Sequence, residues 1–152
     1  TIPGLRRWDK YAVTCGGGTS HRMGLHDAAL FKDNHLASLQ GAQMAEQLAG
    51  AIARARADRS LAFVQVEVDT QDQLAVVLGV PGVDIILLDN MPPDVLKEAV
   101  ATRDAVAPNV QLEASGGITL ASVRAVAESG VDRIAIGALT RDATILDIGL
   151  DA

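Results

Sequence analysis

Cysteine and aromatic residues are scarce in this chain of 152 residues. Cys15 is the only cysteine, so no disulfide can form within the chain, and a reducing compartment such as the cytoplasm is expected. Aromatic residues make up 3% of the sequence, so the core must be built from Ala, Val, Leu and Ile. No apolar run approaches the roughly 18 residues that a membrane-spanning helix needs.

Positive charge is also in short supply. The chain has 13 Lys and Arg residues against 19 Asp and Glu residues, a net charge of -6, which argues against a nucleic-acid-binding protein. The balance is uneven, because residues 1–32 contain five basic and two acidic residues. A basic segment at the start of an acidic chain indicates a site for a small anion, although a chance fluctuation would look the same.

Short runs of β-branched residues and Leu alternate with Ala-rich segments. The runs predict strands at residues 28–32, 62–69, 84–89, 110–113 and 133–136. The segments between them predict helices at residues 41–57, from Thr70 onwards, at 93–106, and from Thr119 to about 129. Thr70 and Gln73 have the spacing of a capping box, and Gly130 is the expected stop of the last helix. This order implies parallel strands with helical crossovers, in either a (β/α) barrel or an open doubly wound sheet.

Polar residues and glycines gather where the predicted strands end. These residues are Lys32, Asp33, Glu67, Asp69, Asp89, Asn90, Glu113, Ser115, Gly116, Gly117 and Gly137. Helix capping accounts for some of them but not for the charged ones together. The carboxyl ends of all strands of a parallel barrel meet at one rim, where active sites lie. The pattern therefore favours the barrel over the open sheet, with too few strands for a complete one.

Three cationic or potentially cationic side chains follow the glycine run at residues 16–18. His21 and Arg22 come three and four residues after it, and Lys32 ends a predicted strand. Arg grips a carboxylate through two parallel hydrogen bonds, and three such donors suit a substrate with several negative charges. The alternatives are a plain flexible loop and an edge strand with Lys32 facing solvent.

Glu67 and Asp89 stand on neighbouring predicted strands. Carboxylates at a rim bind Mg²⁺ directly or through water, and they also accept hydrogen bonds from sugar hydroxyls. The alternative is a structural role in ion pairs with Lys32 or Arg22, which is compatible with function.

Two glycine turns follow the last two predicted strands, at residues 113–119 and 136–140. A Gly-Gly turn before a helix exposes backbone N–H groups to an anion, and successive turns of this kind bind phosphate in many (β/α) barrels. Tight turns without a ligand are the alternative.

Taken together, these segments resemble the quinolinate phosphoribosyltransferase family. The matching stretches are TIPGLR, KYAV, GGGTSHRMGLHD, KDNH, VEVDT, LLDN, EASGGIT, GVDRIAIGALT and LDIGLD, in this order along the chain. The resemblance implies an incomplete, TIM-like α/β barrel, and we expect residues 1–152 to be its C-terminal catalytic domain. Because the chain starts at Thr1, we also expect it to lack the family's N-terminal domain and first barrel strand.

The resemblance further implies an enzyme that joins quinolinate to phosphoribosyl pyrophosphate with Mg²⁺. The products would be nicotinate mononucleotide, pyrophosphate and CO₂, for NAD synthesis. It implies a homodimer or larger homo-oligomer, in which the N-terminal domain of a neighbouring subunit completes each site.

Residue roles also follow from the resemblance. His21, Arg22 and Lys32 would face the quinolinate carboxylates, and Glu67 and Asp89 would contact the ribose hydroxyls and the metal. The phosphate-binding residues would be Ser115, Gly116, Gly117, Gly137 and Ala138.

The sequence departs from the family pattern at several places. Ser20 replaces the usual Asn before the His-Arg pair, and Arg141 and Asp142 replace the usual His-Ser. The Arg-Lys pair that usually comes just before the position of Thr1 is absent. Three other interpretations therefore stay open: a related barrel protein of molybdenum-transport operons, an inactive binding or oligomerisation module, and a phosphate-binding aldolase or isomerase.

Overall fold

The computed structural model describes residues 1–32, 41–58, 61–144 and 146–149. The chain divides into two units, one comprising Arg22–Ile136 and the other Thr1–His21 with Gly137–Ala152. The larger unit contains one open sheet of five parallel strands in the order β1-β2-β3-β4-β5. The strands are β1 (Ala29–Phe31), β2 (Val64–Val68), β3 (Ile85–Asp89), β4 (Gln111–Ser115) and β5 (Arg133–Ile134).

The strand order distinguishes between the two folds that the sequence left open. Each strand pairs with the next one along the chain, and the order never reverses. A doubly wound sheet has a point where the order reverses, whereas consecutive order is that of a barrel. The prediction of an incomplete α/β barrel is confirmed as a five-stranded arc that stays open.

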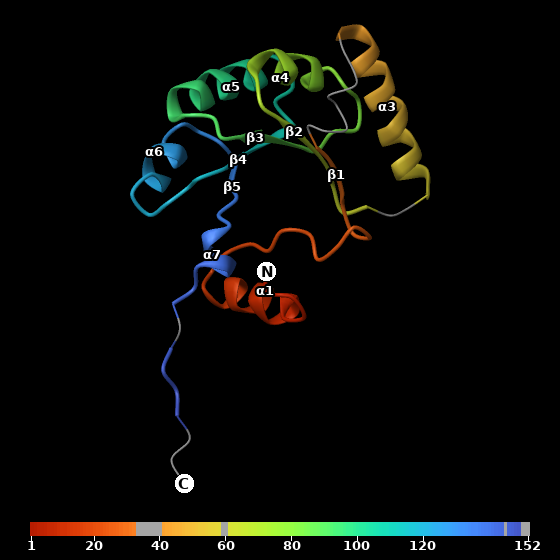
Figure 1. Ribbon diagram of the computed structural model, residues 1–152. Helices are drawn as coiled ribbons and strands as arrows, with labels where there is room; N and C mark the ends of the chain where they lie inside the picture. Colours follow the sequence, from red (N-terminus) through yellow and green to blue (C-terminus); the bar gives the residue numbers. More distant parts are fainter. Residues whose placement is uncertain (33–40, 59–60, 145, 150–152) are drawn as a thin grey trace. The chain divides into compact units, whose positions relative to one another are not determined.

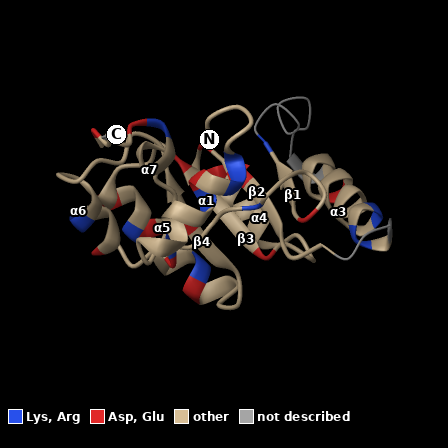
Figure 2. Cartoon of the chain, turned by 90° about the horizontal axis from the view of Figure 1, so that it is seen from below, with Lys and Arg blue, Asp and Glu red and all other residues tan. Residues whose placement is uncertain are grey.

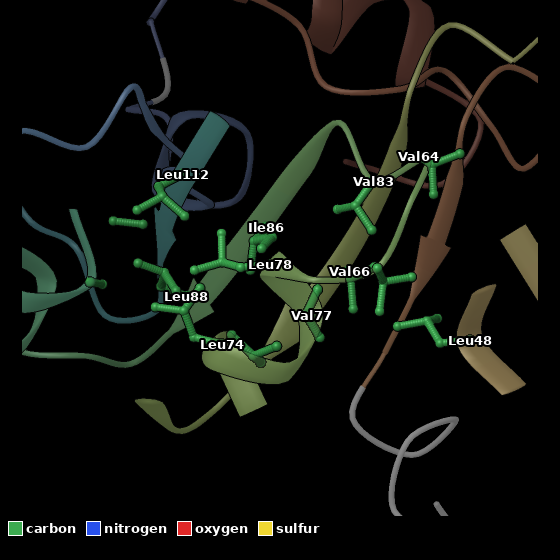
Figure 3. Close-up of a cluster of buried hydrophobic side chains, with 14 of the residues drawn as sticks. Leu48, Val64, Val66, Leu74, Val77, Leu78, Val83, Ile86, Leu88 and Leu112 are labelled. Atoms are coloured by element: carbon green, nitrogen blue, oxygen red, sulfur yellow. The ribbon is translucent and has the colours of Figure 1, made fainter. Parts of the chain in front are cut away.

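Helices connect successive strands on one face of this sheet (Figure 1). They are α3 (Gly41–Asp58), α4 (Gln71–Leu78), α5 (Pro93–Val106) and α6 (Val123–Ala127). Leu74, Val77 and Leu78 of α4 meet Val66, Ile86 and Leu88 of the strands (Figure 3). Acidic and basic positions are interspersed over the outer helices (Figure 2). The core is aliphatic, as the low aromatic content predicts.

Local sequence accounts for two of these helices. At α4, the side chain of Thr70 accepts a hydrogen bond from the Gln73 amide, and the Gln73 side chain accepts one from the Thr70 amide, which confirms the predicted capping box. At α5, Pro93 is the first residue, where its missing N–H costs nothing. The predicted bounds of α5 are confirmed.

The predicted start of α6 at Thr119 is wrong. Thr119 and Ser122 bond each other's backbone amides through their hydroxyls, and the helix begins only at Val123. These side-chain bonds stabilise a separate turn at residues 119–122, so the helix begins after that turn. Gly130, the predicted stop, adopts φ 93°, which suits glycine.

Aspartates at the amino-terminal edge of the sheet link strands to helices. Asp132 precedes β5, and its carboxylate accepts hydrogen bonds from the Leu112 amide at 2.8 Å and from Arg103 of α5 at 2.6 Å. Asp84, before β3, has the same arrangement with the Val64 amide and Arg56 of α3. This edge is thus used for structure, which leaves the carboxyl edge for function.

The smaller unit contains two helices, α1 (Arg6–Cys15) and α7 (Ala138–Arg141). Neither was predicted from the sequence. Helix α1 buries none of its residues, and Trp8 and Tyr11 are 70% and 64% exposed. In the described part of the chain, no helix is long and apolar enough to cross a membrane.

Candidate functional site at the carboxyl edge of the sheet

Strict alternation along β2 divides its side chains between the two faces of the sheet. Val64, Val66 and Val68 are fully buried in the core beneath the helices. Successive strand side chains point to opposite faces, so Gln65 and Glu67 lie on the face that the helices do not cover.

The same alternation continues across the sheet. The residues on the face away from the helices include Gln65 and Glu67 of β2, Ile85, Leu87 and Asp89 of β3, Gln111, Glu113 and Ser115 of β4, and Arg133 of β5. The residues that alternate with them inside these strands belong to the core or pack against it. One face of the sheet is therefore apolar, and the other carries most of the polar groups that the strands contain.

Strand register arranges several of these residues in a row. Glu67 is paired with Leu87, Leu87 with Glu113, and Glu113 with Arg133. Lys32 directly follows β1, and its ammonium group lies 3.4 Å from the Glu67 carboxylate. This ion pair between Lys32 and Glu67 is one of those that the sequence analysis gave as the structural alternative, which is compatible with function.

The Lys32–Glu67 pair is accessible from solvent on its basic side. The Lys32 side chain is 50% exposed, whereas the Glu67 side chain is 13% exposed. An ammonium group that is half in water while its counter-ion is mostly buried can exchange part of that pairing for an incoming carboxylate. The geometry is suited to binding an anion beside a fixed carboxylate.

A second pair, on β4 and β5, is more deeply buried. Glu113 is 2% exposed and accepts hydrogen bonds from Gln65 Nε2 and from Arg133 Nε, both at 2.9 Å. A buried carboxylate needs such partners, because its desolvation otherwise costs several kcal/mol. Glu113 was predicted at a strand end, but β4 runs two residues further, so Glu113 lies in the middle of the strand.

Gln65 and Arg133 are two residues of this face for which the sequence predicted no role. Alternation with Glu67 was the signal for Gln65, because the two residues share a face. Arg133 offers no comparable signal, since its contact with Glu113 depends on the register between β4 and β5.

Asp89 and Ser115 lie side by side at the carboxyl edge, in register at the ends of β3 and β4. The next residue, Asn90, donates from its backbone amide to the Ser115 carbonyl at 2.9 Å. Gly116 and Gly117 then turn the chain with φ of 95° and 58°. The structure thus brings together Lys32, Glu67, Asp89, Ser115, Gly116 and Gly117 within one unit, along the carboxyl edges of β1 to β4.

The sequence predicted that this Gly-Gly turn leads directly into a helix, and this prediction is wrong. The turn at Thr119–Ser122 intervenes, and α6 spans only five residues. Phosphate binding here would depend on the amides of the turn itself, which two successive glycines leave unobstructed by side chains.

Other predicted site residues lie elsewhere. Arg22 Nη1 donates to the Ala28 carbonyl at 3.0 Å, at the amino-terminal end of β1 and hence at the opposite end of that strand from Lys32. His21, Gly137 and Ala138 belong to the smaller unit. The His21 carbonyl accepts a hydrogen bond from Lys10 Nζ at 2.5 Å, and Gly137 precedes α7.

Arg141 and Asp142, which stand where the family usually has His-Ser, form an ion pair with each other. Arg141 donates to both carboxylate oxygens of Asp142, at 2.8 and 2.9 Å. The hydrogen bond from Arg141 lowers the pKa of Asp142 below its ordinary value. Asp33, predicted at the end of the first strand, lies outside the described residues.

The donor set at this edge suits Mg²⁺ bound partly by substrate. Among the described residues, no group of three or more His, Cys, Asp or Glu side chains could enclose a metal ion. Mg²⁺ is commonly held by one or two carboxylates together with substrate phosphates and water. Glu67 and Asp89, on adjacent strands of one face, fit that mode and not an all-protein cage.

The fold and the site define an incomplete α/β barrel with a polar, phosphate-compatible site at the carboxyl edge of its parallel strands. The family model for the quinolinate phosphoribosyl transferase C-terminal domain matches residues 1–151. The chain belongs to this family.

Relatives and solved structures agree with this assignment. The chain is 46% identical to the nicotinate-nucleotide pyrophosphorylase [carboxylating] of Mycobacterium leprae over 99% of its own length and 51% of the relative's. It is 38% identical to the human protein of that name, over 99% and 48%. A crystal structure of nicotinate-nucleotide pyrophosphorylase from Ehrlichia chaffeensis matches with a TM-score of 0.80 and 42% identity, over 99% of this chain and 52% of that one. The chain therefore spans about half the length of the relatives it matches.

Proposed function

We propose that this chain forms the catalytic half of a decarboxylating quinolinate phosphoribosyltransferase, a pentosyltransferase of NAD synthesis. It would transfer phosphoribosyl from phosphoribosyl pyrophosphate to quinolinate and yield nicotinate mononucleotide, pyrophosphate and CO₂. The observation that carries the proposal is the Lys32–Glu67 pair beside Asp89, Ser115 and the Gly116–Gly117 turn. These groups supply a cation, two carboxylates and phosphate-binding amides along one sheet edge.

The cation would orient the dicarboxylate substrate. Lys32 binds one quinolinate carboxylate, and His21 and Arg22 are the further donors that we assign to this ligand. Holding the pyridine nitrogen against the anomeric carbon of the sugar makes bond formation effectively intramolecular. For Arg22, this role requires its guanidinium to leave the Ala28 carbonyl.

The carboxylates would act on the sugar. As the bond between the anomeric carbon and pyrophosphate breaks, positive charge develops on the ribose, and Glu67 and Asp89 stabilise it electrostatically. They also accept hydrogen bonds from the ribose hydroxyls. When bound with them, Mg²⁺ would neutralise charge on the departing pyrophosphate.

Decarboxylation needs no further cofactor. Attack by the ring nitrogen forms the nitrogen–carbon bond and makes the pyridine ring cationic. Loss of CO₂ from the carbon next to that nitrogen leaves an electron pair that the ring's positive charge stabilises, and a proton then replaces the lost group. Ser115, Gly116, Gly117, Gly137 and Ala138 would hold the phosphate groups throughout.

The assembly and location are parts of the same proposal. We infer a homodimer or larger homo-oligomer in which the N-terminal domain of a neighbouring subunit closes the site, and a cytoplasmic location. The oligomer is what membership of this family implies, and the single cysteine supports the proposed location.

Product analysis tests the proposed function. The complete protein that includes this chain is incubated with quinolinate, phosphoribosyl pyrophosphate and MgCl₂, and nicotinate mononucleotide, pyrophosphate and CO₂ are quantified. We expect the three products in equal amounts. Consumption of phosphoribosyl pyrophosphate without nicotinate mononucleotide, or no reaction by a folded protein, would contradict the proposal.

A further inference from the structure

Asn90 occupies an unusual backbone position at the site. It directly follows β3 and has φ 52°, and it is the one non-glycine residue with positive φ in the described part of the chain. Asn tolerates this conformation better than most residues do. Its backbone amide donates to the Ser115 carbonyl, which fixes the residue to the end of β4.

The Asn90 side chain connects two parts of the site. Its Nδ2 donates to Oδ2 of Asp89 at 2.7 Å. Its Oδ1 lies against Gly116, where an added Cβ would be 2.2 Å from that oxygen. One amide therefore contacts both the carboxylate at the end of β3 and the first glycine of the phosphate turn.

We propose that Asn90 is a positioning residue that holds the Asp89 carboxylate in its catalytic orientation. This inference rests on the proposed function, because it concerns the carboxylate that acts on the ribose. The Asn90 amide donates a hydrogen bond to Oδ2 of Asp89, so Oδ1 of Asp89 would accept from a ribose hydroxyl. Gly116 allows this arrangement, because any side chain there would displace the amide.

A purely conformational role for Asn90 makes a different prediction. Glycine adopts positive φ without strain, so Asn90→Gly preserves the turn and removes only the amide. Asn90→Asp keeps the size of the side chain and its tolerance of positive φ, but it replaces the donor with an acceptor facing Asp89. If Asn90 served only the turn, both variants would be active.

The test compares both variants with the wild type in the complete protein. We expect kcat to fall about 10-fold or more in each, the range typical for loss of a group that orients a ligand-binding side chain. The KM for quinolinate should stay within about twofold, because the lost interaction acts on the transition state at the sugar. Calorimetry should show weaker binding of phosphoribosyl pyrophosphate with Mg²⁺, and the melting temperature of Asn90→Gly should match that of the wild type.

Asn109→Gly is the matched control, since Asn109 is an exposed turn residue before β4. It should leave all of these quantities unchanged. Wild-type kcat and wild-type affinity for phosphoribosyl pyrophosphate in Asn90→Gly would refute the positioning role alone. Failure of the wild type itself to form nicotinate mononucleotide would refute the proposed function instead, and this inference with it.

Discussion

Gly116 directly follows β4 and lies against Asn90, the residue that follows β3. A Cβ at this position would be 2.2 Å from Asn90 Oδ1 and 2.9 Å from the Asn90 backbone nitrogen. The side-chain amide can rotate away, but the backbone nitrogen cannot move without breaking its hydrogen bond to the Ser115 carbonyl. Gly117, by contrast, has nothing within 4 Å of such a Cβ.

Gly116→Ala should therefore cost much more than Gly117→Ala. We expect Gly116→Ala to lower the free energy of unfolding by about 2 to 4 kcal/mol, from left-handed strain together with overpacking. For Gly117→Ala, strain alone costs about 1 to 2 kcal/mol. Urea denaturation of both variants measures the difference. Equal losses would show that contact with Asn90 does not constrain the turn.

For single residues, the chemical role was easier to predict from the sequence than the residue that each side chain contacts. Lys32 and Glu67 were recognised because charges are unusual in strand-like runs, and their ion pair was foreseen as an alternative. Asn90 was noted among the polar residues at the strand ends but was given no role, because a polar residue directly after a strand has many possible functions. Its contact with Gly116 depends on how two turns distant in sequence meet.

Among the elements, α4 is the one whose start the sequence defines best. The Thr70 hydroxyl accepts from the Gln73 amide at 3.2 Å, and both lie in the predicted box. Thr102, in the last turns of α5, has a hydroxyl that only bonds back to the Glu98 carbonyl of its own helix. The two threonines therefore contribute differently to helix stability.

Thr70→Val should lower the free energy of unfolding by about 1 kcal/mol, the usual cost of losing a capping side chain. Thr102→Val should change it by less than about 0.5 kcal/mol. Thermal or urea unfolding of the two variants checks this. A loss in Thr102→Val as large as that in Thr70→Val would mean that the cap is not the cause.

Elements without a buried apolar face were the hardest to predict. Helix α1 was missed although its apolar residues are spaced as on one face of a helix, and none of its residues is buried. The spacing of Leu5, Trp8 and Tyr11 by three residues was the available signal. For α6, the start at Thr119 was a reasonable prediction from residue type, but the competing bonds with Ser122 decided the outcome.

At the scale of the whole molecule, the amino-terminal edge of the sheet contributes to the way stability responds to acid. Burial alone raises the pKa of Asp132, but hydrogen bonds from the Leu112 amide and from Arg103 outweigh it, so the pKa lies below its ordinary value. Arg103 is 6% exposed and joins α5 to this edge. The pair links the last two strands to the helix layer.

Stability should fall in acid, and Asp132 should contribute to the fall. A carboxyl group with a lowered folded-state pKa stabilises fully above its unfolded pKa of about 3.9 and loses that contribution as pH falls through the folded value. Asp132→Asn should cost about 1 to 3 kcal/mol at neutral pH and make the decline below about pH 4 shallower. Unfolding free energies from pH 7 to pH 2 test this.

The control for this experiment is Asp142→Asn, which removes a carboxylate from an exposed ion pair. Solvent and salt screen such pairs, so the acid profile should stay close to that of the wild type. If the unfolding free energy of Asp132→Asn depended on pH as that of the wild type does, the proposed role of Asp132 at this edge would be contradicted.

The sheet order could be predicted in outline, because alternating strands and helices imply parallel neighbours. The registers between the strands could not, since they depend on contacts between residues far apart in the sequence. Arg22 shows the same limit. Its motif indicates an anion-binding role, but it does not say at which end of β1 the side chain lies.

The central claim is that the polar face at the carboxyl edge of β1 to β4 binds the dicarboxylate substrate. Calorimetric titration of quinolinate into the complete protein tests it through Lys32→Gln, with Lys97→Gln on the exposed surface of α5 as a control that removes the same charge. We predict at least about 10-fold weaker binding in Lys32→Gln, equivalent to the loss of one charge-assisted contact, and no change in Lys97→Gln. Equal affinities in the wild type and both variants would contradict the account.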